Sequence, residues 1–151
     1  MMGWSQGGGI ALVAASRNDQ IKSVVTWAGA LYDGTIDEEA YAVAKEEGFY
    51  LSEYEWREPL KLSPEYFEVL QEFVVEDAIP EVKASILALN GSEDDVVLPE
   101  TGQEIAKLAT NEDTKHEIIE GADHTFNIFT EDLTKFEELV EKTISWFENM
   151  L

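Results

Sequence analysis

The first residues of the chain place a serine between glycines, in the order Gly3-Trp4-Ser5-Gln6-Gly7. The spacing G-x-S-x-G is typical of a sharp turn that joins a strand to a helix and projects the serine hydroxyl. A serine in such a turn has a strained backbone, and we expect that neither Gly3 nor Gly7 has room for a Cβ. Ser5 is therefore a candidate nucleophile. The alternative of a phosphate-binding P-loop is excluded because no Gly-Lys-Ser/Thr follows the turn.

A nucleophilic serine requires a base, and the chain contains two histidines. His124 lies in the segment Gly121-Ala122-Asp123-His124-Thr125-Phe126, directly after an expected strand. We take it as the candidate base. His116 lies at the start of that strand beside charged neighbours, and we expect it to be a surface residue.

The base in turn requires an acid that orients its ring. The segment 91–97 follows another expected strand and contains several acids, of which Asp94 is the preferred candidate. Asp95 and Glu93 in the same loop remain alternatives, Asp95 if the turn differs by one residue. Asp123 is a fourth candidate, but it adjoins His124 in sequence, so their side chains should diverge.

The elements that must position these residues follow an alternating pattern. A helix is expected from Gln6 to about Arg17, and the β-branched and aromatic run 23–27 indicates a buried strand. Further expected elements are a strand at 84–90, a helix from Pro99 to about Thr110, a strand at 116–120 and a long final helix. Alternating strands and helices favour an α/β fold with a parallel sheet, whose carboxyl-end loops would carry Ser5, Asp94 and His124 in that order.

The final helix is expected to begin with Thr130 as its cap. Apolar residues at helical spacing predict its buried face, which would consist of Leu133, Phe136, Val140, Ile144 and Phe147.

The segment between the first two complete strands is longer than a crossover helix requires. We divide the chain into a core of residues 1–33 and 81–151 and a cap insert of about 34–80. The insert should contain a helix at 37–47 that ends at Gly48, and a second helix that Ser63 caps and Pro64 begins. Such an insert could act as a lid.

Composition narrows the classes of function. The chain has 151 residues, no cysteine and a net charge of −22 from 32 acidic and 10 basic residues. This charge disfavours nucleic acid and anionic membranes as partners. No apolar run reaches the roughly 18 residues that span a membrane, and no signal-peptide pattern is visible. We therefore expect a cytoplasmic protein without a disulfide framework or a thiolate metal site.

The combination of G-W-S-Q-G-G, L-N-G-S-E-D-D-V-V-L-P and E-G-A-D-H-T-F resembles the C-terminal portion of an α/β-hydrolase. Within that superfamily the layout is similar to bacterial cinnamoyl (feruloyl) esterases and serine-aminopeptidase-like hydrolases. The resemblance implies a catalytic triad of Ser5, Asp94 and His124, with the backbone N–H of Gln6 in the oxyanion hole. It implies hydrolysis of a small-molecule carboxylic ester and no metal or organic cofactor. A peptidase or thioesterase would use the same triad.

Aromatic residues of the insert and the nucleophile turn are candidates for substrate binding. We single out Trp4, Tyr32 and Trp56, although aromatic side chains at these positions could equally serve packing.

The resemblance also implies that strands and one oxyanion-hole donor precede the nucleophile turn in the family. We therefore expect either a truncated sequence or a chain that needs a complementing upstream segment or a second copy, and little activity from the isolated chain. A non-catalytic half-domain that assembles with a partner is the alternative from another class.

Overall fold

The computed structural model describes residues 1–54 and 57–150. The chain folds into two compact units, which we call the sheet unit (residues 1–31 and 75–151) and the insert unit (residues 32–74). In the described part of the chain, no helix combines the length and the apolar character needed to cross a membrane.

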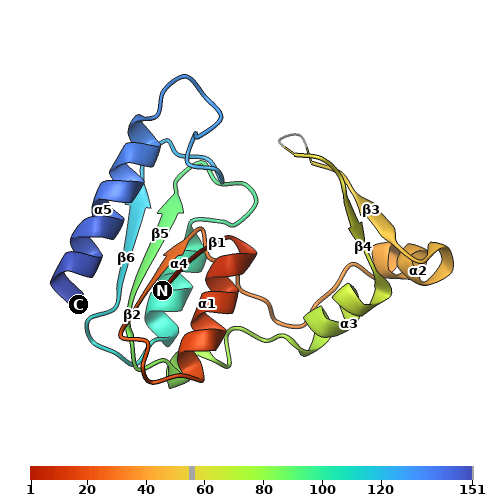
Figure 1. Ribbon diagram of the computed structural model, residues 1–151, viewed down its shortest axis with the longest axis horizontal. Helices are drawn as coiled ribbons and strands as arrows, with labels where there is room; N and C mark the ends of the chain where they lie inside the picture. Colours follow the sequence, from red (N-terminus) through yellow and green to blue (C-terminus); the bar gives the residue numbers. More distant parts are fainter. Residues whose placement is uncertain (55–56, 151) are drawn as a thin grey trace. The chain divides into compact units, whose positions relative to one another are not determined.

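The sheet unit is built on four parallel strands in the order β1-β2-β5-β6 (Figure 1). Its elements are β1 (Met2–Trp4), α1 (Gln6–Ser16), β2 (Ser23–Trp27), the 3-10 turn η1 (Ile79–Glu81), β5 (Ser85–Gly91), α4 (Glu100–Leu108), β6 (Lys115–Ile119) and α5 (Thr134–Met150). Every residue of β5 is buried, as expected for a parallel strand covered on both faces. The α/β fold with a parallel sheet that the sequence predicts is therefore confirmed.

Helices cover both faces of this sheet. Successive side chains of a strand point to opposite faces, and β2 shows both directions. Trp27 donates its indole N–H to Thr143 of α5 at 2.9 Å, whereas Thr26 lies on the opposite face, close to Gly8 of α1. Helix α4 lies on the same face as α1, since its Gly102 packs directly against Asn90, which shares a face with the strand partner of Thr26.

The expected start of the final helix is wrong, and its expected buried face is only partly right, since Phe136, Val140 and Phe147 are half-buried. Helix α5 begins at Thr134, and the hydroxyl of Thr130 instead donates to the carbonyl of Asn127. Leu133 and Ile144 are exposed. The fully buried residues of the helix are Leu139, Thr143 and Trp146.

The reason for the error is that two positions on the buried face carry polar groups. Thr143 accepts the bond from Trp27, and the Trp146 indole donates to the hydroxyl of Ser23 at 2.8 Å. Because a polar residue such as Thr143 interrupts the apolar pattern, the apolar residues alone indicated a neighbouring face of the helix.

The insert unit has its own small core. It contains α2 (Glu38–Glu47), an antiparallel hairpin of β3 (Tyr50–Ser52) and β4 (Leu60–Leu62), and α3 (Pro64–Glu72). Its buried cluster is formed by Ala40, Ala44 and Phe67. Asp37 caps α2 by accepting from the N–H groups of Glu39 and Ala40 at 3.0 and 2.9 Å. The sequence did not predict the hairpin.

Gly48 ends α2 in the left-handed region, at φ 83°, as glycine commonly does. Pro64 begins α3 with Ser63 before it. The insert unit is shorter than the expected range of about 34–80, because η1 and residues 75–78 belong to the sheet unit.

Candidate active site

Ser5 occupies the junction between β1 and α1 in a strained conformation. Its φ is 54° and its ψ is −124°, a combination that residues with a side chain rarely adopt. The surrounding backbone holds it there: Ser5 N–H donates to the Trp27 carbonyl at 2.8 Å, and the Ser5 carbonyl accepts from the N–H groups of Gly8 and Ala30 at 2.9 and 3.0 Å. The turn is thus tied to the end of β2.

The glycines around this turn differ in what they contribute. A Cβ on Gly3 would overlap the carbonyl of Gly7, so Gly3 has the steric role that the sequence indicated. Gly7 does not, because a Cβ there would meet nothing within 4 Å. The close approach is made instead by Gly8, where a Cβ would lie 2.6 Å from the Cα of Gly29. The steric restriction that the sequence predicted at Gly7 therefore lies at Gly8.

Asp94 lies in the loop after β5 and is only 3% exposed. Its Oδ1 accepts from the backbone N–H groups of Val96 and Val97 at 2.9 and 2.8 Å, which fixes the carboxylate in one orientation. Asp95 and Glu93, the alternatives in the same loop, are exposed.

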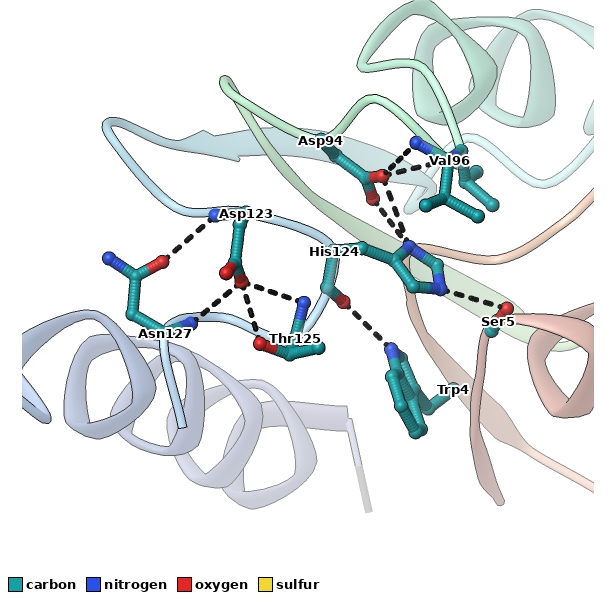
Figure 2. Close-up of polar contacts among 9 residues, drawn as sticks. Trp4, Ser5, Asp94, Val96, Asp123, His124, Thr125 and Asn127 are labelled. Atoms are coloured by element: carbon teal, nitrogen blue, oxygen red, sulfur yellow. Dashed lines mark hydrogen bonds and ion pairs between the residues drawn. The ribbon is translucent and has the colours of Figure 1, made fainter. Parts of the chain in front are cut away.

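His124 lies in the loop after β6, and its ring joins the other two candidates (Figure 2). Its Nδ1 is 2.9 Å from Oδ2 and 3.1 Å from Oδ1 of Asp94, and its Nε2 is 3.1 Å from the hydroxyl oxygen of Ser5. A carboxylate can only accept, so Nδ1 carries the proton toward Asp94 and leaves Nε2 to accept from Ser5. His124 is 7% exposed and Asp94 3%, so their contact is shielded from bulk water, whereas Ser5 is half-buried.

The loops that carry Asp94 and His124 are tied together. Glu93 N–H donates to the Ala122 carbonyl at 2.9 Å, and Gly121 N–H donates to the hydroxyl of Ser92 at 2.7 Å. Gly91 permits this approach, because a Cβ on it would overlap the Ala122 carbonyl. Ser92 is a contributor that the sequence reasoning missed, and its place directly after Gly91 was the available signal.

Asp123, the fourth candidate acid, turns away from the ring of His124 (Figure 2). Its Oδ1 accepts from the N–H and hydroxyl of Thr125, both at 2.8 Å, and from Asn127 N–H at 2.9 Å. Asn127 reciprocates by accepting from Asp123 N–H at 2.9 Å. Burial opposes ionisation of the carboxyl, but these hydrogen bonds outweigh it and hold the pKa of Asp123 below its usual value.

Trp4 contacts His124 directly. Its indole N–H donates to the backbone carbonyl of His124 at 3.0 Å, and the two rings lie 5.4 Å apart between centroids. Trp4 also lines an apolar cavity of about 170 Å³. The other lining residues are Trp27, Thr125, Phe126, Ile128, Phe129, Phe136 and Leu139.

Of the other candidate substrate-binding residues, Tyr32 is half-buried in the insert unit. Its ring lies 6.0 Å from that of Phe73, and burial, with smaller contributions from Tyr66 and Tyr54, raises its pKa to about 12. Trp56 lies outside the described residues.

The expectation that His116 is a surface residue is wrong. Its Nε2 is buried with no hydrogen-bond partner among the described residues, and burial lowers its pKa. It lies with Asn90 against Gly102, on the face of the sheet that α4 covers. No group of three or more histidine, aspartate and glutamate residues in the described part of the chain is arranged to hold a metal ion.

Several solved structures share this fold. The monoacylglycerol lipase of Paleococcus ferrophilus matches with a TM-score of 0.75 and 19% identity, over 99% of this chain and 68% of that one. Est1E from Butyrivibrio proteoclasticus matches with a TM-score of 0.68 and 24% identity, over 98% of this chain and 59% of that one. The mouse alpha/beta hydrolase domain-containing protein 10 matches with a TM-score of 0.73 and 15% identity, over 99% and 62%.

The chain thus spans between about half and two thirds of the length of the solved structures it matches. Comparison with curated protein sequences finds no match. The fold is that of the α/β-hydrolases, as the sequence resemblance implied. The sequence model of the prolyl oligopeptidase family matches residues 1–151, so the chain belongs to this family.

Proposed function

We propose that the protein is a serine hydrolase that cleaves carboxylic esters through an acyl-enzyme intermediate. The observation that carries this proposal is the unbroken series of contacts from Ser5 Oγ to His124 Nε2 and from His124 Nδ1 to Asp94, at 3.1 and 2.9 Å. Nucleophilic acyl transfer uses a hydroxyl as nucleophile, an imidazole as general base and a buried carboxylate that orients the imidazole, in this order.

In the proposed reaction, Ser5 Oγ attacks the ester carbonyl while His124 Nε2 takes its proton. Asp94 keeps Nδ1 protonated and stabilises the imidazolium that forms. The tetrahedral intermediate collapses, and His124 returns the proton to the departing alcohol. Water, activated by the same nitrogen, then attacks the acyl-Ser5 ester and releases the acid. Each step balances without a metal or an organic cofactor.

The oxyanion would be stabilised by the backbone N–H of Gln6. Gln6 is the first residue of α1, and the first N–H groups of a helix have no acceptor within the helix and lie at the positive end of its dipole. A second hydrogen-bond donor to the oxyanion is also part of the proposal. We infer that it comes from a complementing segment or a second copy, because one missing donor costs about 2.7–4 kcal/mol of transition-state stabilisation.

The apolar part of the substrate is proposed to enter the cavity beside Trp4. Its volume of about 170 Å³ is close to that of an apolar cavity of about 150 Å³ that holds benzene, so a phenyl ring or a short alkyl chain would fit. Est1E has been solved with ferulic acid bound, which is an aromatic acid. Tyr32 and Trp56 remain proposed contributors from the insert unit.

A second candidate activity is peptide hydrolysis. The family to which the chain belongs takes its name from an oligopeptidase, and the same three side chains would cleave an amide. A thioesterase would use them too, but no observation favours it.

Parallel assays of p-nitrophenyl acetate, butyrate, hexanoate and decanoate and of prolyl p-nitroanilides would distinguish these activities. Because a second oxyanion donor is missing from the isolated chain, we expect only slow hydrolysis of the esters, with a maximum at butyrate or hexanoate because the cavity is small. Ser5→Ala should abolish it. Ser16→Ala is the matched control, since Ser16 lies on α1 and its hydroxyl bonds only the Val13 carbonyl among the contacts seen. Faster cleavage of the anilides than of every ester would favour the peptidase, and full ester activity of Ser5→Ala would overturn the proposal.

A further inference from the structure

We propose that Trp4 is a positioning residue that holds His124 in register with Ser5 through its indole N–H. The inference rests on the proposed function, because it names a residue that acts through the proposed base. This positioning role is additional to the substrate contact proposed for Trp4 at the apolar cavity. The contact that motivates it is the 3.0 Å hydrogen bond from Trp4 Nε1 to the backbone carbonyl of His124.

Trp4 and Ser5 are adjacent at the end of β1, so a bond from Trp4 ties the base to the strand that carries the nucleophile. The other backbone hydrogen bonds described above for this loop connect it to the loop of Asp94 or to itself. The bond from Glu93 to Ala122 fixes it to the acid loop, and Asp123 with Asn127 fixes it to itself. Of the hydrogen bonds described above, the indole bond is the one that links the backbone of the base loop to β1.

The base loop needs such a tie because its own backbone is strained. Phe126 and Asn127 follow His124 closely and have φ values of 55° and 59°, in the left-handed region. Residues other than glycine adopt that region at a cost and only where the surroundings impose it. A loop held in this way moves to a different position when one of its anchors is removed.

The distance that depends on this anchor is the one on which proton transfer depends. The His124 ring nitrogen lies 3.1 Å from Ser5 Oγ, which is within the range for a base that must take a proton. A displacement of about 1 Å at a reacting centre can cost on the order of a hundredfold in rate. A small shift of the base loop would therefore lower the rate of acylation without changing how strongly substrate binds.

The indole contributes a hydrogen bond and an aromatic surface, and one substitution separates them. Trp4→Phe keeps a ring against the cavity and against His124 but removes the N–H. The matched control is Trp146→Phe, which removes a buried indole N–H bond of 2.8 Å to Ser23, in the same unit but on α5. Both variants lose one hydrogen bond of the same chemical kind, and only one of the two bonds reaches His124.

The experiment measures ester kinetics, thermal unfolding and the histidine ring NMR spectrum of wild type and both variants. We expect Trp4→Phe to lower kcat about three- to tenfold with KM nearly unchanged, since a net hydrogen bond changes an equilibrium by about that factor. Trp146→Phe should lower the melting temperature and leave kcat unchanged. In an Asp94→Asn background the effect of Trp4→Phe should shrink, because residues that act through one group are not additive.

The NMR measurement makes the inference independent of the proposed function. The Nδ1 proton of His124 should exchange with water faster in Trp4→Phe than in wild type, whether or not esters are cleaved. Faster exchange in Trp4→Phe together with full ester activity of Ser5→Ala would support the positioning role and overturn the proposed function. Unchanged kcat and unchanged proton exchange in Trp4→Phe would overturn the inference, as would a rise in KM with constant kcat, which would make Trp4 a substrate contact only.

Discussion

At the scale of single residues, the three proposed catalytic groups are held by different means. Ser5 is held in a strained conformation by backbone hydrogen bonds, and Asp94 is held by two backbone N–H groups. His124 is held by its side-chain contacts with these two residues and by the bond from Trp4 to its carbonyl. The orientation of the His124 ring therefore depends on the Asp94 side chain, both of whose oxygens face Nδ1.

This dependence predicts a large difference between two neighbouring aspartates. Asp94→Asn should lower kcat by about 10⁴-fold, because an amide NH₂ can face Nδ1 and favour the wrong tautomer. Asp95→Asn should change kcat less than about twofold, since surface substitutions have small effects. Steady-state kinetics on the best ester would measure both. Equal losses in the two variants would mean that the acid has been assigned to the wrong residue.

The carboxylate of Asp123 predicts an acid-sensitive part of the folding stability. Burial disfavours its charge, but bonds from Asn127 and Thr125 lower its folded-state pKa below the unfolded value near 3.8. Its ionised form therefore stabilises the fold above that pH, and this stabilisation is lost as the pH falls through the folded-state pKa. Asp123→Asn keeps an acceptor but cannot ionise, so its unfolding free energy should fall less steeply below pH 3.8.

Urea denaturation of wild type and Asp123→Asn at a series of acidic pH values would test this prediction. Parallel curves for the two proteins would show that the carboxylate is not the source of the acid dependence.

At the scale of elements, the site depends on the packing of α1 against the ends of β1 and β2. Gly8 makes the close approach to Gly29, whereas Gly7 faces open space. We expect Gly8→Ala to destabilise the protein by roughly 1–3 kcal/mol through overpacking. Gly7→Ala should be neutral or stabilising by up to about 1 kcal/mol, because alanine is the better helix former.

The two alanine variants control for each other, as the same methyl group is added one residue apart. Denaturant unfolding gives both free energies. A larger loss in Gly7→Ala than in Gly8→Ala would contradict the packing described for this helix.

The elements also show what the sequence could reveal. The loops that carry Asp94 and His124 were predictable because each follows an expected strand and carries a short motif, and the turn that carries Ser5 was predictable from the G-x-S-x-G spacing. The hairpin of β3 and β4 was not, since three-residue strands are too short to display periodicity. The role of Trp4 was also hidden, because its bond to His124 crosses 120 residues of chain.

At the scale of the whole molecule, the net charge of −22 is the dominant property. Ion pairs such as those of Lys83 with Asp19 and of Lys107 with Glu104 are exposed and therefore weak, so they do little against the repulsion among the acidic residues. Repulsion among the remaining acids should oppose folding at low ionic strength.

Salt should therefore raise the melting temperature. Between about 0.02 and 0.5 M sodium chloride the screening length falls several-fold, so acid–acid repulsion weakens more than the few attractive pairs do. Differential scanning calorimetry at neutral pH would measure the shift. A melting temperature that falls with added salt would mean that attractive pairs outweigh the repulsion.

Labelling with a fluorophosphonate shows whether Ser5 is a nucleophile that His124 activates. The purified protein should form a covalent adduct on Ser5, located by mass spectrometry of the N-terminal peptide. Labelling should be absent in Ser5→Ala, strongly slowed in His124→Ala and unchanged in Ser16→Ala. An adduct that forms equally well in Ser5→Ala, or the absence of any adduct in a protein shown to be folded, would contradict the account.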